Sequence, residues 1–195
     1  MRVTFLGTGT SVGVPRIACT CPVCTSADPR NKRLRCSLLL ENAGQYALVD
    51  TTPDLRTQVL RVGLQRLDAV LFTHAHADHL HGLDDVRCFC LQRQEPLPCF
   101  AAPATVARIR TVFDYAFRSD NVSSVPQLHL QPVSGPFSVA GLDIQPVPLQ
   151  HGQQPVLGFR TGAFAYLTDC SEIPQGSWPL LANLEVLVLD ALRDR

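Results

Sequence analysis

Residues 74–79 read His-Ala-His-Ala-Asp-His, and no other part of the sequence restricts the fold as strongly. They follow residues 69–72, a short apolar run that we expect to form a buried strand ending at Thr73. Side chains two positions apart share a face in extended chain, so His74 and His76 are expected to bind one ion, while the turning chain directs Asp78 and His79 at another. Imidazole combined with carboxylate suits zinc, and also manganese, iron or nickel.

Two further ligand candidates follow predicted strands in the second half of the chain. His151 comes after residues 142–149, and Asp169 comes after residues 164–168. Taken alone, an Asp at a strand end is typical of a turn, and a single His is typical of a structural or exposed position. Together with residues 74–79, the two side chains complete a ligand set for two metal ions.

The remaining pattern predicts a mixed α/β fold. Helical spacing with a stop at Gly63 begins near Pro53, and further helices are expected over residues 83–92 and 103–117, separated from their neighbours by Pro-containing segments. Strands are expected at residues 3–6, 37–40, 46–49, 142–147, 157–161, 164–167 and 185–189, with a tight hairpin at 161–163. Strands with interspersed helices favour stacked sheets covered by helices. The length favours one domain over residues 1–195.

Three of the eight cysteines crowd into a Cys-x-Cys-x-x-Cys knuckle formed by Cys19, Cys21 and Cys24. The knuckle lies in the long loop 15–35, and a loop of that length in a compact domain is usually functional or held by a metal. Thiolates favour zinc, so we expect a structural Zn²⁺ here, with three reduced loop thiols as the alternative.

Two other parts of this region have less specific patterns. Residues 7–13 are rich in glycine but lack the endings of known nucleotide-binding loops, so we expect a turn beside the metals. The basic run 30–35 has the charge to meet a substrate phosphate, although such charges more commonly face water.

The charge balance argues against a polyanionic partner. There are 17 basic and 17 acidic residues, so no global field attracts nucleic acid or an anionic membrane. The sequence shows neither a secretory leader nor an apolar run of the ~18 residues that a membrane span requires. We therefore expect a cytoplasmic protein without nucleic-acid or membrane partners.

The ligand set resembles the metallo-β-lactamase superfamily, whose pattern is an Asp at a strand end, His-x-His-x-Asp-His, a lone His, a bridging Asp and a final His. The resemblance spans nearly the whole chain and implies an αββα four-layer sandwich. It implies that Asp50 orients the site, that His74, His76 and His151 hold one metal, that Asp78 and His79 hold the other, and that Asp169 bridges them. Two divalent ions, Zn²⁺ or Mn²⁺, would supply a metal-bound hydroxide, and Asp78 is interpreted as a catalytic residue that orients it.

The knuckle, residues 6–10 (Leu-Gly-Thr-Gly-Thr) and the dinuclear motif together resemble the PhnP family, which acts on phosphoribosyl 1,2-cyclic phosphate. The resemblance implies a phosphodiesterase that cleaves a small cyclic or nucleotide-like phosphodiester. Three alternatives stay open: a ribonuclease Z-like RNA endonuclease, a lactonase or thioesterase, and a non-catalytic zinc-binding carrier like PqqB, which has a similar knuckle. A homodimer is also left open.

The sequence departs from the family pattern at its C-terminal end. No histidine follows His151, so the family's final metal ligand, its catalytic-acid histidine and the fourth ligand of the knuckle zinc would all lie beyond Arg195. We therefore expect that this sequence is a truncated form that lacks the C-terminal strand and helix of the fold. There are two alternatives: another ligand or subunit replaces the missing histidines, or this form is inactive.

Overall fold

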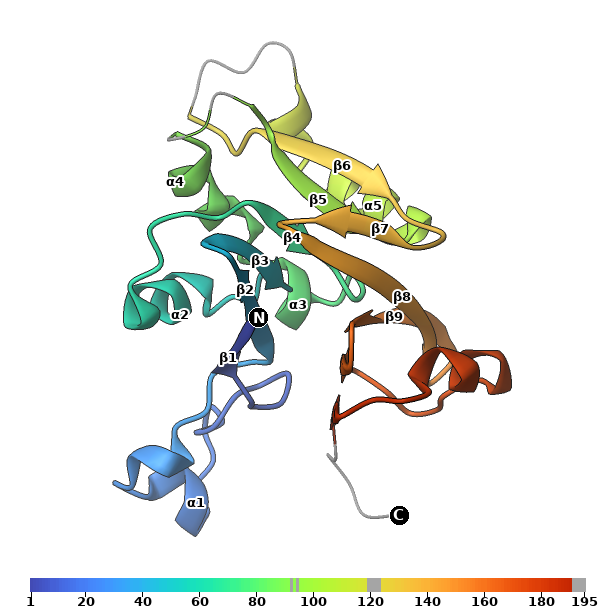
Figure 1. Ribbon diagram of the computed structural model, residues 1–195. Coiled ribbons are helices and arrows are strands. Elements are labelled where there is room, and N and C mark those ends of the chain that lie inside the picture. Colours follow the sequence, from blue (N-terminus) through green and yellow to red (C-terminus); the bar gives the residue numbers. More distant parts are fainter. Residues whose placement is uncertain (92, 94, 119–123, 191–195) are drawn as a thin grey trace.

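Two β-sheets face each other in the computed structural model, which describes residues 1–91, 93, 95–118 and 124–190 (Figure 1). The strands are β1 (Arg2–Gly7), β2 (Ser37–Asn42), β3 (Gln45–Val49), β4 (Ala69–Leu71), β5 (Leu97–Ala101), β6 (Leu128–Pro132), β7 (Phe137–Val139), β8 (Leu142–His151), β9 (Gln154–Thr161), β10 (Phe164–Leu167) and β11 (Val186–Leu189). The first sheet has the order β1-β2-β3-β4-β5-β6, antiparallel from β1 to β3 and parallel from β3 to β6. The second has the order β11-β10-β9-β8-β7, in which β10 and β11 pair in parallel and the other neighbours are antiparallel.

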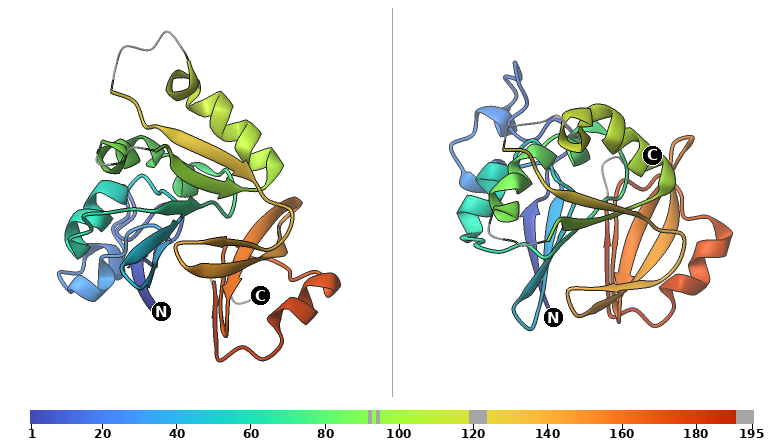
Figure 2. Two further views of the ribbon diagram at one scale, coloured as in Figure 1. Left: turned by 45° about the horizontal axis from the view of Figure 1, so that its top comes forward. Right: turned by 90° about the horizontal axis from the view of Figure 1, so that it is seen from above.

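Helices connect the strands, and some of them cover the outer faces of the two sheets. They are the α-helices α1 (Pro22–Thr25), α2 (Leu55–Val62), α3 (Ala77–Leu80), α4 (Arg87–Cys90) and α5 (Pro103–Val112), and the 3₁₀ helices η1 (Pro29–Asn31), η2 (Leu83–Val86), η3 (Asp114–Phe117) and η4 (Gln175–Leu181). Seen from above, the strands form two adjacent layers with α5 outside the first and η4 outside the second (Figure 2). None of the helices in the described residues is long and apolar enough to cross a membrane.

Strict alternation along the strands of the first sheet builds two separate cores. In β2, Leu38 and Leu40 face the second sheet, whereas Leu39 faces the helices. The same alternation places Leu48 of β3 and Val70 of β4 on the helix side, because successive side chains of a strand point to opposite faces. Both faces of this sheet are therefore buried, which is typical of parallel strands with helical connections.

A third cluster lies on the outer face of the second sheet and makes the fourth layer. Val147, Val156 and Leu167 pack there against Leu180 and Leu181 of η4. The expected αββα sandwich is confirmed, with a 3₁₀ helix as the outer layer on this side in the part of the chain that the structure describes.

Several element boundaries differ from those expected. The strands β5, β6 and β7 were not predicted, because Pro98, Pro132 and their neighbours read as connections; Pro98 nevertheless pairs with His129 in parallel register. Of the helix expected over 83–92, residues 83–86 are 3₁₀ and 87–90 are α-helical, and residue 92 lies outside the described residues. The helix expected over 103–117 breaks at Phe113, whose φ of -115° and ψ of 41° are not helical.

The hairpin and the helix stop at Gly63 are confirmed. Thr161 pairs with Phe164 across the tight turn between β9 and β10. Gly63 ends α2 with a φ of 65°, a left-handed conformation that glycine adopts without the steric cost that a Cβ brings. The helix itself begins at Leu55, two residues after Pro53.

Candidate metal centre

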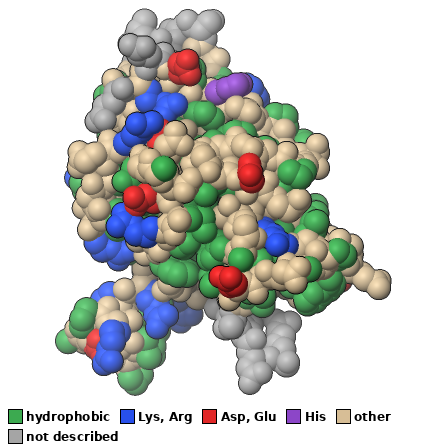
Figure 3. Space-filling model, in the orientation of Figure 1, with side chains coloured by type: hydrophobic (Ala, Val, Ile, Leu, Met, Phe, Trp, Pro, Cys, Tyr) green, Lys and Arg blue, Asp and Glu red, His purple; other side chains and the backbone are tan. Residues whose placement is uncertain are grey.

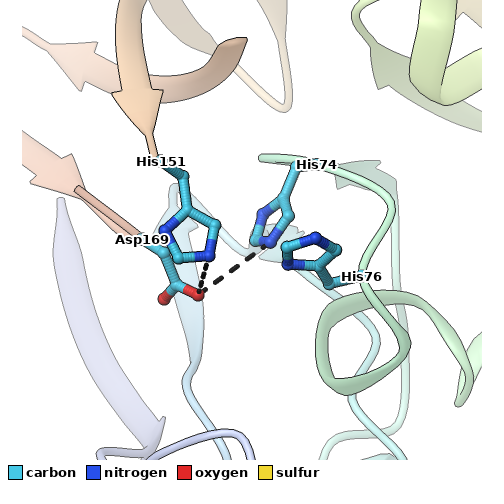
Figure 4. A group of neighbouring side chains, drawn as sticks. All are labelled: His74, His76, His151 and Asp169. Atoms are coloured by element: carbon cyan, nitrogen blue, oxygen red, sulfur yellow. Dashed lines mark ion pairs between the residues drawn. The ribbon is translucent and has the colours of Figure 1, made fainter. Parts of the chain in front are cut away.

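Four strands from both sheets end close together and carry the candidate ligands. Asp50 follows β3, His74 comes shortly after β4, His151 is the last residue of β8, and Asp169 comes shortly after β10. Figure 4 shows His74 and His76 on one loop, with their rings turned toward His151 and Asp169 from the second sheet. Side chains about 100 residues apart in sequence thus meet at one end of the sandwich.

The ligands expected for the first metal surround one point. One ligand atom of each of His74, His76, His151 and Asp169 lies within 4.8 Å of the others. Oδ2 of Asp169 lies 3.9 Å from Nε2 of His74 and 3.6 Å from Nε2 of His151. The ring centroids of His74 and His76 are 4.5 Å apart, and those of His76 and His151 are 5.2 Å apart.

The ligands expected for the second metal form an adjacent group that shares Asp169. His76 has an extended conformation and ends the loop, so that the first turn of α3 directs Asp78 and His79 back toward the second sheet. Nε2 of His79 lies 3.3 Å from Oδ2 of Asp78 and 3.5 Å from Oδ2 of Asp169. Asp169 is the one residue common to both groups, which is the geometry required of a bridging carboxylate.

Asp50 belongs to neither group, but it contacts the second group directly through His79 and is linked to the first group through Thr73. Its side chain is fully buried, and its carboxylate accepts hydrogen bonds from the backbone N–H (2.9 Å) and the hydroxyl (2.8 Å) of Thr73. Nδ1 of His79 lies 2.8 Å from Oδ2 of Asp50. Because an ionised carboxylate only accepts, Nδ1 of His79 must carry the proton, which leaves Nε2 to face the metal site.

Thr73 extends this orientation to His74. Its hydroxyl donates to Asp50, so its oxygen is left to accept from Nδ1 of His74 at 2.9 Å. That bond places the proton of His74 on Nδ1 and leaves the lone pair of Nε2 directed into the site. Sequence reasoning did not identify Thr73, because its role depends on a contact with Asp50 from a different strand.

The pKa values reflect the crowding of like and unlike charges. Burial, followed by the charge of His79, lowers the pKa of His74 to about 3. Burial also disfavours the charged form of His79, but the carboxylates of Asp50, Asp169 and Asp78 outweigh burial and raise the pKa of His79 to about 12. Burial acts to raise the pKa of Asp169, but the hydrogen bond and charge of His79 outweigh it and hold that pKa well below its usual range.

These residues fit divalent cations on three observations. Nε2 of His74 is buried and has no hydrogen-bond partner among the described residues, although a buried imidazole nitrogen normally has one. Three carboxylates converge on the single imidazole of His79, an arrangement that a cation stabilises. Imidazole and carboxylate are the donors that zinc and manganese accept.

The candidate ligands open into a pocket of about 600 Å³, within the range of small-molecule sites. His76, Asp78, His79, His151 and Asp169 line it together with the glycine-rich residues 7–11, so the expectation of a turn beside these ligands is confirmed. Sequence reasoning missed the polar lining residues Cys36, Tyr166, Thr168 and Asp190, and left Arg33 unassigned. Their positions follow from the contact between the two sheets, for which the sequence carries no local signal.

The knuckle lies apart from this pocket, on a lobe that includes α1 and projects from the body of the molecule (Figure 1). The sulfur atoms of Cys19, Cys21 and Cys24 lie within 4.8 Å of one another, and no fourth His, Cys, Asp or Glu joins them among the described residues. The backbone N–H of Arg16 donates to Sγ of Cys24 at 3.4 Å. Hydrogen bonds from Cys21 and Cys24 lower the pKa of the half-buried Cys19 thiol to about 7, which favours the thiolate that binds metal.

Comparison with known proteins places this chain in a family. A profile of the Beta-lactamase superfamily domain matches residues 45–195. An octanoyltransferase of Porphyromonas gingivalis is 41% identical over 198 residues, a match that covers the whole of this chain but 40% of the relative's length. The chain thus spans well under half of that curated relative.

Two solved structures extend the comparison. The crystal structure of a diphosphatase from the PhnP family is 42% identical and superposes with a TM-score of 0.91, covering 99% of this chain and 74% of the other. Zn²⁺-bound PqqB from Methylobacterium extorquens shares the fold at 22% identity, with a TM-score of 0.71 over 97% of this chain and 72% of PqqB. The chain therefore belongs to the β-lactamase superfamily and, within it, to the PhnP family.

Proposed function

We propose that the protein is a metal-dependent hydrolase, and more narrowly a phosphodiesterase that acts on a small cyclic or nucleotide-like phosphodiester. The observation that carries the proposal is the pair of ligand groups that share Asp169 at the mouth of a pocket of about 600 Å³. Two metals joined by one carboxylate are a recurrent device for ester and phosphoester hydrolysis. The likeness to the PhnP-family diphosphatase supports phosphorus chemistry in particular.

In this proposal His74, His76 and His151 hold one divalent cation, Asp78 and His79 hold the second, and Asp169 bridges them. Bound Zn²⁺ or Mn²⁺ would lower the pKa of a water molecule and stabilise negative charge on the phosphoryl oxygens. Asp50 is a positioning residue, because its hydrogen bonds to His79 and Thr73 keep the Nε2 lone pairs of His79 and His74 directed into the site.

Asp78 is proposed as both a ligand and a catalytic residue that orients the attacking water. Burial acts to raise its pKa, but the hydrogen bond and charge of His79 outweigh burial and lower it. A carboxylate with a lowered pKa is a strong acceptor and a weak base. We therefore assign Asp78 to accepting and orienting a proton donor rather than to removing its proton.

The remaining expectations are proposed in the same way. Cys19, Cys21 and Cys24 hold a structural Zn²⁺, and the substrate is a small phosphodiester rather than nucleic acid, since the net charge is zero. We also propose that the protein is cytoplasmic, has no membrane partner and forms a homodimer.

The proposal is tested by counting metals per chain and assaying bis(p-nitrophenyl) phosphate hydrolysis. His76→Ala is expected to lose metal from the first group and to lose turnover. His129→Ala is the matched control, because His129 is exposed on β6, away from the pocket, and should leave both unchanged. Full metal loading of the wild-type protein without any diester hydrolysis would refute the phosphodiesterase.

A second candidate function is hydrolysis of an acyl ester or thioester, and it is tested in parallel with a second substrate. The octanoyltransferase relative is the observation in its favour, although most of that relative lies outside the match. Turnover of p-nitrophenyl octanoate that exceeds diester turnover and is lost in His76→Ala would favour this candidate. Metal bound only by the knuckle, with neither substrate turned over, would favour a zinc-binding carrier.

A further inference from the structure

The basic segment 30–35 carries four cationic side chains, and the structure divides them into two kinds. Arg30 pairs with Asp28, with 2.6 Å between Nη2 and Oδ2. Arg35 pairs with Asp54 at 2.9 Å between Nη1 and Oδ1, and its Nε donates to the carbonyl oxygen of Ser11. The other two cations of the segment, Lys32 and Arg33, make no ion pair within the described ranges.

Arg33 is fixed at the pocket by its backbone. Its N–H donates to the carbonyl oxygen of Val14 at 2.7 Å, and its own carbonyl oxygen accepts from the N–H of Val14 at 2.9 Å. Arg33 lines the same pocket as His76, Asp78 and Asp169, whereas Lys32 does not. The chain is extended at Lys32, so neighbouring side chains point to opposite sides, and only one of these two cations faces the candidate metal centre.

The glycines at 7 and 9 allow this segment to lie against the wall of the pocket. A Cβ at Gly9 would lie 2.6 Å from the carbonyl oxygen of Arg33, and one at Gly7 would lie 1.9 Å from that of Arg35. Glycine at both positions therefore permits the close backbone approach. The same approach places Thr8 and Thr10 on the pocket wall beside Arg33, where their hydroxyls are hydrogen-bond donors.

The surface around this segment is rich in cations. Lys and Arg side chains gather on the projecting lobe and where it joins the body of the molecule (Figure 3). Three carboxylates of the described residues line the pocket. Asp78 and Asp169 belong to the candidate metal centre, so bound cations would offset their charge, and Asp190 accepts a hydrogen bond from the backbone N–H of Cys170. Arg33 then remains as the one cationic side chain among the residues described as lining the pocket.

We propose that Arg33, together with the hydroxyls of Thr8 and Thr10, binds a second phosphoryl group of the substrate, next to the one held at the metals. A guanidinium binds phosphoryl oxygens in a two-pronged, charge-assisted manner that a lysine does not reproduce. The inference rests on the proposed function and narrows it to nucleotide-like phosphodiesters that carry a second, adjacent phosphoryl group, such as esters of a nucleoside diphosphate. Arg33 is a specificity-determining residue in this scheme.

The test is equilibrium binding of two non-hydrolysable probes, methylenediphosphonate and methylphosphonate, to the metal-loaded protein at a fixed excess of Mn²⁺. The probes differ by one phosphonate group. The probes chelate Mn²⁺ in solution to the same extent with every variant. The ratio of the dissociation constants of two variants therefore reflects only the difference between the proteins. Arg33→Gln is expected to weaken binding of methylenediphosphonate roughly 10- to 100-fold, the cost of losing charge-assisted hydrogen bonds, and that of methylphosphonate less than about threefold.

Two further variants separate this explanation from a general effect of charge. Lys32→Gln removes the same charge one residue away and is expected to change both affinities by less than about threefold, because Lys32 does not line the pocket and its charge is screened from it. Arg33→Lys keeps the charge without the two-pronged geometry and should bind methylenediphosphonate with intermediate affinity. Equal effects of Arg33→Gln and Lys32→Gln, or equal losses for both probes, would overturn the inference.

The two proposals can fail separately. If the wild-type protein hydrolyses bis(p-nitrophenyl) phosphate but Arg33→Gln binds methylenediphosphonate as tightly as the wild type, the inference about Arg33 is wrong and the hydrolase stands. If the probes bind in an Arg33-dependent way but no phosphoester is hydrolysed, the anion site stands and the proposed activity is wrong.

Discussion

Replacing Asp50 with asparagine tests whether one buried carboxylate controls the tautomers of two candidate ligands. In the structure Oδ1 of Asp50 accepts from the Thr73 backbone, and Oδ2 faces both the Thr73 hydroxyl and Nδ1 of His79. Asparagine keeps the shape but turns one oxygen into an N–H donor. If its oxygen retains the Thr73 backbone bond, its amide nitrogen faces Nδ1 of His79.

The size of the effect follows from that mismatch. Either His79 moves its proton to Nε2, where it blocks the metal, or two donors face each other in a fully buried site. An unsatisfied buried donor costs about 1–3 kcal/mol, and loss of a group that orients a ligand typically costs about 10- to 100-fold in metal affinity. We expect Asp50→Asn to bind Zn²⁺ at the His79 group about 10- to 100-fold more weakly, and to unfold about 1–3 kcal/mol more easily.

The assay is calorimetric titration of metal-free protein with Zn²⁺, combined with chemical denaturation. Asp68→Asn is the matched control, because Asp68 is also a largely buried carboxylate that accepts a backbone hydrogen bond, from Tyr46, but it precedes β4 and lies at the opposite end of that strand from the site. It should lose stability without losing metal affinity. If Asp50→Asn bound Zn²⁺ as tightly as the wild type, or if both variants lost metal affinity equally, the argument from tautomers would be refuted.

Three further outcomes are expected. Gly7→Ala should destabilise the protein by more than about 1 kcal/mol in chemical denaturation, because a Cβ there would lie 1.9 Å from a backbone oxygen. Gly176→Ala is the control: its Cβ would enter open space and should change the free energy of unfolding by less than about 1 kcal/mol. Equal effects of the two substitutions would contradict the close backbone approach at Gly7. Cys24→Ser should lower the zinc content by one ion per chain, whereas Cys88→Ser, at an exposed cysteine outside the knuckle, should leave it unchanged. An unchanged zinc content in Cys24→Ser would show that the knuckle binds no zinc. The pKa of His79 is raised to about 12, so a metal must displace a proton from His79 at neutral pH, and metal affinity should fall as the pH is lowered. Calorimetry in buffers of different ionisation enthalpy would detect the released proton. If no proton were released on metal binding, this protonation state of His79 would be wrong.

Much of the fold and of the candidate ligand set could be read from local patterns in the sequence. The short apolar runs 37–40 and 46–49 predict strands, and the spacing of residues 74–79 predicts a metal site after the strand 69–72. Such patterns are visible because each depends on neighbours within a few residues along the chain. The strands β5 and β6 were missed because Pro98 and Pro132 obscure that local pattern, while pairing with neighbouring strands supplies the stability that the segments lack by themselves.

The long-range contacts were decided only by the tertiary structure. Asp50 meets Thr73 and His79, which lie 23 and 29 residues further along the chain, because β3 and β4 pair in parallel and end together. Arg33 faces the pocket and Lys32 does not, because the bridge between Val14 and Arg33 sets the orientation of an extended segment whose charges look alike in the sequence. Composition and spacing determined which chemical groups are present, and the packing of two sheets determined which of them share one site, since only packing brings together groups that are distant along the chain.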